Sequence, residues 1–247
     1  MADTLKILSI YEAVDGEANA WHQGTWSVFI RTAGCQVGCR WCDTVYSWPA
    51  NRGMEYTVPE LLGKIAQVGH ARKVTLTGGE PLEQPVHVVA DLLHGLVTRG
   101  YRVTIETAGT EPVAWLKNYH ASVALVLDYK LPSAHILKPL VLENFVALGE
   151  RHVIKFVVAT EDDYQEALRV IRQFQPPYTY ARMVLSPLVA VRKHASAYTL
   201  PQWIEKMKAD GLPGLDVGLN LQLHKLIYPA DAREEESGGA DYSDVRT

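Results

Sequence analysis

The sequence predicts an α/β protein of one domain, in which a parallel sheet forms a partial (βα)6 barrel of the TIM type. Short β-branched runs alternate at least six times with longer amphipathic segments, at a spacing of about 25 to 35 residues, which is typical of parallel strands joined by right-handed crossovers. Hydrophobic residues make up 47 % of the chain, enough for a large core. No change in composition marks a second domain.

Seven segments are predicted as strands because β-branched, aromatic and leucine residues are concentrated in them. In chain order they are WSVFIRT (26–32), KVTLTG (73–78), YRVTIETAG (101–109), VALVLDYK (123–130), HVIKFVVAT (152–160), ARMVLSPL (181–188) and LDVGLNLQLHK (215–225).

Five amphipathic segments between these strands are predicted as helices. The first, 57–70, begins with a capping box between Thr57 and Glu60, and the second, 84–100, ends at Gly100. The others span 140–150, 160–174 and 199–210. The acidic stretch 231–247 contains few apolar residues and is expected to be a disordered tail, so the predicted domain covers residues 1–230.

Composition and charge exclude several classes of function. The net charge is −4 and Lys and Arg form no basic stripe, which disfavours a nucleic-acid groove or an anionic membrane surface as partner. The N-terminus lacks the pattern of a signal peptide, and no apolar run approaches the roughly 18 residues of a membrane span. We therefore expect a cytoplasmic protein whose cysteines are reduced.

Polar side chains follow five of the predicted strands at the point where each strand ends. They lie at 77–81, 106–109, 128–130, 186–187 and 222–225. In a βα barrel the carboxyl ends of the strands meet at one rim, where active sites lie. Each cluster alone is equally compatible with ordinary loop and cap residues, but together they predict a site at this rim.

All three cysteines lie within eight positions, at Cys35, Cys39 and Cys42, with Gly34 and Gly38 between or before them. A structural zinc site would need a fourth ligand such as His22 or His70. A redox cysteine would need a thioredoxin-like context, which is not evident. Three thiolates also suit a [4Fe-4S] cluster in which one iron stays open for a ligand outside the protein.

The segment CQVGCRWC resembles the Cys-x3-Cys-x-aromatic-Cys motif of the radical S-adenosylmethionine (SAM) superfamily, with Trp41 at the aromatic position. TGGEP at 77–81 is similar to its glycine-rich motif. The resemblance implies a barrel of the radical SAM type. It also implies that the open iron binds SAM, whose cleavage releases a 5′-deoxyadenosyl radical.

From about Ile7 to Pro229 the chain resembles the 7-carboxy-7-deazaguanine synthase family of queuosine and 7-deazapurine biosynthesis. The family signature Thr-x-Gln-Gly-Glu-Gly reads AVDGEA here, with Asp15 in place of the amide, and Arg31 precedes the cysteines. The resemblance implies a lyase acting on 6-carboxy-5,6,7,8-tetrahydropterin. Hydrogen abstraction from carbon 6 starts a ring contraction that releases ammonia, and SAM is regenerated.

The same resemblance assigns residue roles. A [4Fe-4S] cluster is implied on Cys35, Cys39 and Cys42, and a magnesium ion on Thr44. Substrate binding is implied for Val14, Asp15, Gly16, Glu17, Arg31, Thr77 and His224. SAM binding is implied for Trp41, Cys42, Asp43, Gly78, Gly79, Asp128, Tyr129, Lys130, Ser186, Pro187 and Leu188.

The implied partners are the small-molecule substrate, an external electron donor such as flavodoxin or ferredoxin, and a second copy in a homodimer. Two alternatives stay open at this point. One is a radical SAM activase that makes a glycyl radical on a partner protein. The other is a zinc-stabilised binding module without catalysis.

Overall fold

The computed structural model describes residues 3–188 and 198–227, so the predicted acidic tail lies outside the described residues. One nine-stranded sheet runs in the order β3-β1-β2-β4-β5-β6-β7-β8-β9. Strands β2 and β4 to β9 pair in parallel, whereas β1 pairs antiparallel with both β2 and β3. The predicted partial barrel is confirmed.

The elements follow the chain in a βα order after an antiparallel start. The strands are β1 (Thr4–Val14), β2 (Trp26–Thr32), β3 (Met54–Thr57), β4 (Lys73–Gly78), β5 (Arg102–Thr107), β6 (Val123–Asp128), β7 (Val153–Val158), β8 (Arg182–Pro187) and β9 (Gly218–Leu219). The helices are α1 (Val58–Val68), α2 (Val86–Thr98), α3 (Glu161–Gln173), α4 (Leu200–Ala209) and α5 (His224–Ile227).

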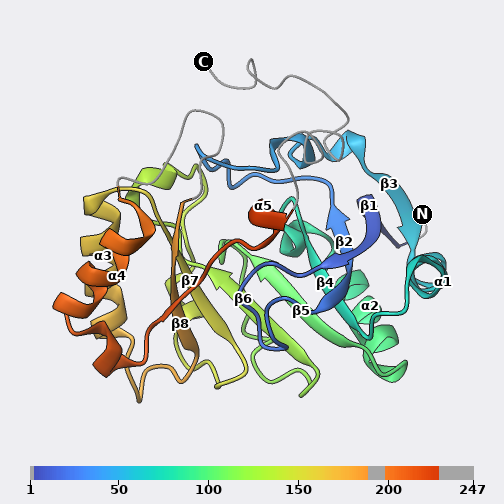
Figure 1. The fold of residues 1–247 in the computed structure, drawn as a ribbon. Coiled ribbons are helices and arrows are strands. Elements are labelled where there is room, and N and C mark those ends of the chain that lie inside the picture. The colour runs from blue at the N-terminus through green and yellow to red at the C-terminus, as the bar shows by residue number, and fades with distance from the viewer. Residues whose placement is uncertain (1–2, 189–197, 228–247) are drawn as a thin grey trace.

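Helices cover the outer face of the curved sheet, with α1 and α2 at one end and α3 and α4 at the other (Figure 1). Side chains alternate between the two faces of each strand. In β4, Val74 and Leu76 belong to the core beneath the helices, whereas Thr75 and Thr77 make polar contacts on the inner side. This alternation directs polar residues toward the barrel interior.

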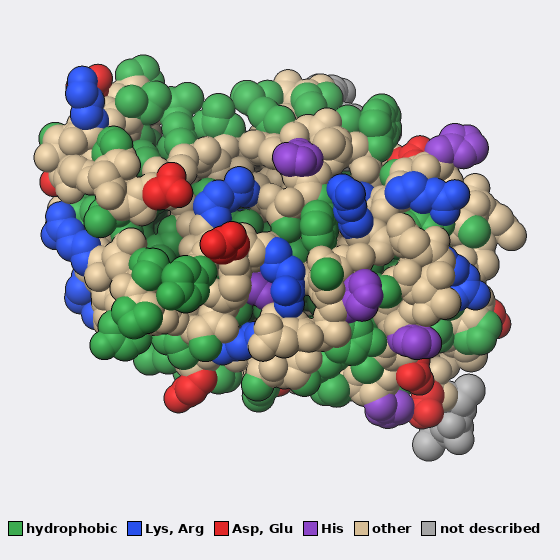
Figure 2. Space-filling view, turned by 90° about the horizontal axis from the view of Figure 1, so that it is seen from below, with side chains coloured by type: hydrophobic (Ala, Val, Ile, Leu, Met, Phe, Trp, Pro, Cys, Tyr) green, Lys and Arg blue, Asp and Glu red, His purple; other side chains and the backbone are tan. Residues whose placement is uncertain are grey.

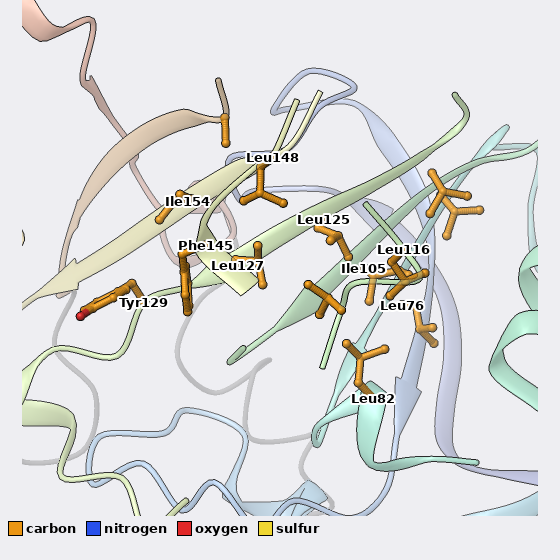
Figure 3. Close-up of a cluster of buried hydrophobic side chains, with 14 of the residues drawn as sticks. Leu76, Leu82, Ile105, Leu116, Leu125, Leu127, Tyr129, Phe145, Leu148 and Ile154 are labelled. Carbon is orange, nitrogen blue, oxygen red and sulfur yellow. The ribbon is translucent and has the colours of Figure 1, made fainter. Parts of the chain in front are cut away.

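The core between sheet and helices is a continuous cluster of aliphatic and aromatic side chains. Figure 3 shows part of it, with Leu125 and Leu127 of β6 beside Phe145 and Tyr129. The ring of Tyr129 lies 5.0 Å from that of Phe145, measured between centroids. Tyr129 therefore packs in the core behind the sheet.

Two predicted elements differ from the structure. The predicted helix 140–150 is reduced to a 3-10 turn over Leu142–Phe145, because the Asn144 amide binds the carbonyls of Gly109 and Glu111 and its oxygen accepts the Val113 N–H. The predicted strand 215–225 pairs only over Gly218–Leu219. Strands β1 and β3 were absent from the sequence prediction.

The segment that follows β9 is bonded to the loop between β1 and β2. Its Leu223 N–H donates to the Gly16 carbonyl at 3.0 Å. The Gln23 amide donates to the Asn220 side chain and to the carbonyl oxygens of Gly16 and Leu221. Helix α5 lies near the level of the β2 arrowhead, to its left in Figure 1.

Charge is mixed over the surface seen from below in Figure 2, where Lys and Arg side chains are interspersed with acidic, histidine and hydrophobic ones. Within residues 3–188 and 198–227, no helix has the length and apolar character that a membrane span requires.

Candidate active site

A large cavity opens at the carboxyl rim of the strands, at the place that the polar clusters predict. It is bordered by the loop after β1, the cysteine loop after β2, the ends of β4 to β7 and the segment before α5. The predicted site residues that line it are Val14, Asp15, Gly16, Glu17, Arg31, Cys35, Cys39, Trp41, Cys42, Asp43, Thr44, Thr77, Gly78, Gly79, Asp128, Lys130, Leu188 and His224.

Three predicted SAM contacts lie outside this cavity. Tyr129 follows Asp128 and so points to the opposite side, into the aromatic core. The Ser186 hydroxyl is buried and accepts a hydrogen bond from the Asn220 amide at 3.0 Å. Pro187 ends β8 beside Val158. These three residues do not border the cavity, and their assignment to SAM stays a prediction.

The cysteine loop is shaped by its glycines and by backbone hydrogen bonds. Gly34 and Gly38 have φ values of +102° and +67°, which a residue with a β-carbon rarely adopts. The Gly34 N–H donates to the Ser47 carbonyl at 2.8 Å, and the Arg40 N–H to the Ala134 carbonyl at 2.8 Å. Val37, Ala108 and Ile136 pack around the thiols.

The donor chemistry of this loop fits a [4Fe-4S] cluster. Burial raises the pKa of Cys35 to about 12 and that of Cys39 to about 11, so both stay protonated at neutral pH until a metal takes the proton's place. Across the described ranges, no three side chains of His, Cys, Asp or Glu converge to hold one metal ion. In a [4Fe-4S] cluster each of the three thiolates binds a different iron, so the thiols need not converge on one point.

Gly78 and Gly79 form a close backbone crossing beside the thiols. A β-carbon on Gly79 would overlap the Gly34 carbonyl, and one on Gly78 would overlap the Thr32 backbone. The Gly79 N–H is already bonded to the Thr32 carbonyl at 2.9 Å, while Gly78 has a φ of +117°. Only glycine therefore fits where the end of β4 meets the cysteine loop.

Glu17 is held by donors from two distant parts of the chain. Its Oε1 accepts from the Gln222 amide at 2.7 Å, and its Oε2 from the Asn220 amide at 2.9 Å and from Lys155 Nζ at 3.5 Å. Burial alone would raise the pKa of Glu17, but Lys155, His224 and the two amides together lower it. A negative charge is thereby kept in the cavity.

Arg31 projects from the inner face of β2 into the same cavity. Its Nη2 donates to the Tyr11 hydroxyl at 2.8 Å, and its guanidinium lies 5.7 Å from the centre of the Tyr46 ring. Burial opposes the charge, yet the tyrosines and Asp43 raise the pKa of Arg31 above its ordinary value. The side chain is therefore a fixed cation with donors left for a ligand.

Asp15 borders the cavity, but both of its carboxylate oxygens are already engaged. Oδ1 accepts the Glu17 N–H at 3.2 Å, and Oδ2 accepts from Thr75 Oγ1 at 2.9 Å and pairs with Lys73 Nζ at 3.0 Å. The Asp15 side chain is only 1 % exposed. Asp15 therefore holds the loop that carries Glu17, and its contact with the substrate stays a prediction.

Replacing Asp15 with Asn is expected to lower the free energy of unfolding by about 3 kcal/mol, because the buried Lys73 ammonium loses its counter-charge. The double variant D15N/K73M should recover part of this loss, since neither partner is then left charged. Urea denaturation of the wild type, D15N, K73M and the double variant measures both effects. Equal losses in D15N and the double variant would contradict the ion-pair account.

Several cavity residues were not assigned roles from the sequence, among them Glu106, Gln222, Lys155 and Lys225. Glu106 and Gln222 belong to the predicted polar clusters at strand ends, but neither was assigned to a ligand from the sequence. Lys155 and Lys225 are buried lysines. The signal for Lys155 is a lysine inside the otherwise apolar run VIKFVV, a position at which a buried strand rarely places a charge.

Glu106 is an unusual carboxyl because Oε1 is buried without a protein partner while Oε2 accepts from Thr77 Oγ1 at 2.7 Å. Burial raises the pKa of Glu106 from 4.5 to about 7. The negative charges of Asp15 and Glu17 add to this rise, and the positive charge of Lys155 offsets only part of it. The Thr77 hydroxyl therefore donates a hydrogen bond to the Glu106 carboxyl, in addition to any contact that it makes with a ligand.

The raised pKa of Glu106 predicts a dependence of stability on pH. The protonated form favours the folded state, so this contribution is complete below pH 4.5 and is lost as the pH rises through about 7. The neutral variant E106Q should match the wild type near pH 4.5 and be more stable by about 1–3 kcal/mol at pH 8. Denaturation at both pH values checks this; an unchanged difference would contradict it.

The residues after the third cysteine face the C-terminal segment. Partial burial opposes ionisation of Asp43, but Lys225, whose Nζ lies 3.0 Å from Oδ2, lowers the pKa of that carboxyl. The Thr44 hydroxyl lies 3.5 Å from the Gly78 carbonyl. His224 packs so closely on Gly16 that a β-carbon there would overlap its backbone.

Comparison with known proteins identifies the family. The model of the Radical SAM superfamily matches residues 29–189. The chain is 32 % identical over 232 residues to 7-carboxy-7-deazaguanine synthase of Clostridium acetobutylicum, covering 92 % of this chain and 98 % of the relative. It is 30 % identical to that of Koribacter versatilis, with 93 % and 99 % covered.

A solved structure supports the fold. The crystal structure of QueE from Escherichia coli aligns with a TM-score of 0.67 at 23 % identity, over 89 % of this chain and 94 % of that one. Together with the extent and identity of the sequence matches, we conclude that this chain belongs to the radical SAM superfamily and, within it, to the 7-carboxy-7-deazaguanine synthase family.

Proposed function

We propose that this chain is a 7-carboxy-7-deazaguanine synthase that contracts the ring of 6-carboxy-5,6,7,8-tetrahydropterin with loss of ammonia. The observation that carries the proposal is one cavity in which three thiols, a carboxylate and a guanidinium face one another. The chain that contains this cavity is at least 30 % identical to two relatives named as synthases over more than 90 % of its length. The glycyl-radical activase and the zinc module are not favoured by these relatives.

Cys35, Cys39 and Cys42 would hold the [4Fe-4S] cluster, leaving one iron open for SAM. When bound, the cluster and SAM supply the radical chemistry that removes a hydrogen atom from carbon 6 of the substrate. The buried surroundings of the thiols restrict the access of water to this chemistry.

For the substrate, we assign Glu17 to the aminopyrimidine edge and Arg31 to the carboxylate. The Glu17 carboxylate is already oriented by Asn220 and Gln222, and it retains lone pairs for donors of the ring. Arg31 can pair with a carboxylate through two parallel hydrogen bonds. His224 and Thr77 would complete the enclosure from the C-terminal segment and from β4.

For SAM, the assigned contacts are the backbone at Gly78 and Gly79, the Trp41 side chain and the Asp128–Lys130 pair. The Trp41 indole donates to Ser133 Oγ at 3.1 Å and packs on Leu188, so its orientation is fixed. Lys130 Nζ lies 2.8 Å from Asp128 Oδ2. Thr44 is assigned as a magnesium ligand because a hydroxyl oxygen suits this hard cation.

We further infer an external one-electron donor such as flavodoxin or ferredoxin, assembly as a homodimer, and action in the cytoplasm. These assignments rest on the family resemblance and on the three unpaired cysteines.

The proposal is tested by anaerobic reconstitution followed by a product assay. Protein with reductant, SAM and 6-carboxytetrahydropterin should yield 7-carboxy-7-deazaguanine, identified by mass spectrometry. Stoichiometric release of 5′-deoxyadenosine without the contracted product would overturn the assignment and direct attention to an activase.

Replacing Arg31 with Ala is expected to abolish turnover while leaving the iron content unchanged, because the cation serves the substrate and does not contact the thiols. Iron analysis and the product assay measure the two effects separately. The matched control is R40A in the exposed part of the cysteine loop, which should keep both. Loss of iron in R31A would indicate a structural role instead.

A further inference from the structure

Lys155 is a buried lysine for which the proposed function provides no role. Its side chain is 9 % exposed and stands on β7 directly opposite Asp128 of β6 in the parallel register. Paired positions on neighbouring strands direct their side chains to the same face, here the barrel interior. Burying an ammonium costs several kcal/mol unless it is paired, so its partners define its role.

Lys155 has two carboxylate partners on different elements. Its Nζ lies 3.5 Å from Glu17 Oε2 and 3.6 Å from Asp128 Oδ2. Within the two described ranges, it is the only cation with an ion pair to both. Lys130, the other partner of Asp128, makes an ion pair with that carboxylate alone. Lys155 therefore joins two sides of the cavity electrostatically.

The two carboxylates are assigned to different ligands, Glu17 to the substrate and Asp128 to SAM. Asp128 Oδ1 is buried and has no protein partner, so it is left for a donor from a ligand. Glu17 keeps lone pairs although its two oxygens are bonded. Each carboxylate can thus accept a further hydrogen bond from its ligand while both pair with the Lys155 ammonium.

We propose that Lys155 is a positioning residue that couples the binding of SAM to the binding of the substrate, an inference that rests on the proposed function. When SAM donates to Asp128 Oδ1, that carboxylate draws the shared ammonium less strongly, so Lys155 pairs more closely with Glu17 and keeps it ionised and oriented for the substrate. A substrate donor on Glu17 favours the pairing of Lys155 with Asp128 in the same way. The coupling is positive, and by linkage each ligand tightens the other by the same factor.

The coupling can be measured without turnover. Anaerobic holoenzyme with an oxidised cluster and no reductant is titrated with SAM by calorimetry, with and without saturating 6-carboxytetrahydropterin. In the wild type the substrate should lower the Kd of SAM about fivefold or more. In K155M this ratio should fall below about twofold, and K155R, which retains the charge, should restore it.

The matched control is K130M, which removes the other ammonium from Asp128. It should weaken SAM binding yet keep the ratio, because Lys130 does not contact Glu17. A purely structural lysine would change stability and both affinities without changing the ratio. If K155M fails to fold, K155Q carries the same expectation, since it removes the charge and keeps a donor.

Independent binding of both ligands to the wild type, or an unchanged ratio in K155M, would overturn the coupling and leave the proposed function standing. Failure of the wild-type holoenzyme to bind either ligand would overturn the proposed function, and the coupling with it.

Discussion

Replacing Cys39 with Ala is expected to remove the cluster and to abolish turnover. Three thiolates are the minimum that the cysteine loop offers to four irons, and no other Cys in the sequence can substitute. Bound iron should fall from about four atoms per chain to nearly none, and the broad visible absorbance should be lost with it. Iron analysis and absorbance of the reconstituted protein measure this.

The loss in C39A should be specific to the thiol. Cys39 is buried beside Val37 and Ala108, where a methyl group is tolerated, so the variant should still fold. Far-ultraviolet circular dichroism provides the control. A C39A protein that binds the full complement of iron and turns over would contradict the assignment of these cysteines.

Replacing Glu17 with Gln is expected to lower kcat/KM about a hundredfold or more. The new amide would direct its NH2 group at the amide donors of Gln222 or Asn220, and Lys155 would lose one counter-charge. Loss of the charged acceptor for the pterin ring is expected to cost about 3 kcal/mol of transition-state binding, which corresponds to about two powers of ten in kcat/KM. Steady-state kinetics with varied pterin measure the change.

The matched control for E17Q is E12Q on the neighbouring strand β1. The Glu12 carboxylate accepts only backbone N–H groups of His70 and Ala71 away from the cavity, so kcat/KM should stay near the wild-type value. Equal losses in both variants would show that the effect of E17Q comes from the stability of β1 and not from the site.

Much of the fold is predictable because the parallel strands carry strong local signals. The runs at 26–32 and 73–78 match β2 and β4 residue for residue, and the Thr57–Glu60 capping box begins α1 as expected. The helix predicted at 140–150 is absent because the buried Asn144 amide replaces helical hydrogen bonds by contacts to a loop 33 to 35 residues earlier. No local pattern reveals such a contact.

The candidate site also has one part that local sequence motifs predict and another part that they do not. The three cysteines, the Gly78–Gly79 pair and Arg31 are found from short motifs, whereas the crossing of Gly79 with Gly34 is visible only in the structure. The Asn220 and Gln222 contacts to Glu17 join positions separated by more than 200 residues, and the role of Asp15 depends on Lys73. The Asn220 and Gln222 contacts form because the segment after β9 packs against the loop after β1. The hydrophobic periodicity of the sequence does not predict where that segment lies.

Turnover under limiting SAM tests the central claim most directly. Reduced holoenzyme is supplied with excess 6-carboxytetrahydropterin and less than one equivalent of SAM, and the contracted product is counted against SAM consumed. The account predicts many equivalents of 7-carboxy-7-deazaguanine for each SAM, with SAM recovered at the end. At most one product per SAM, or 5′-deoxyadenosine accumulating in step with SAM loss, would contradict it.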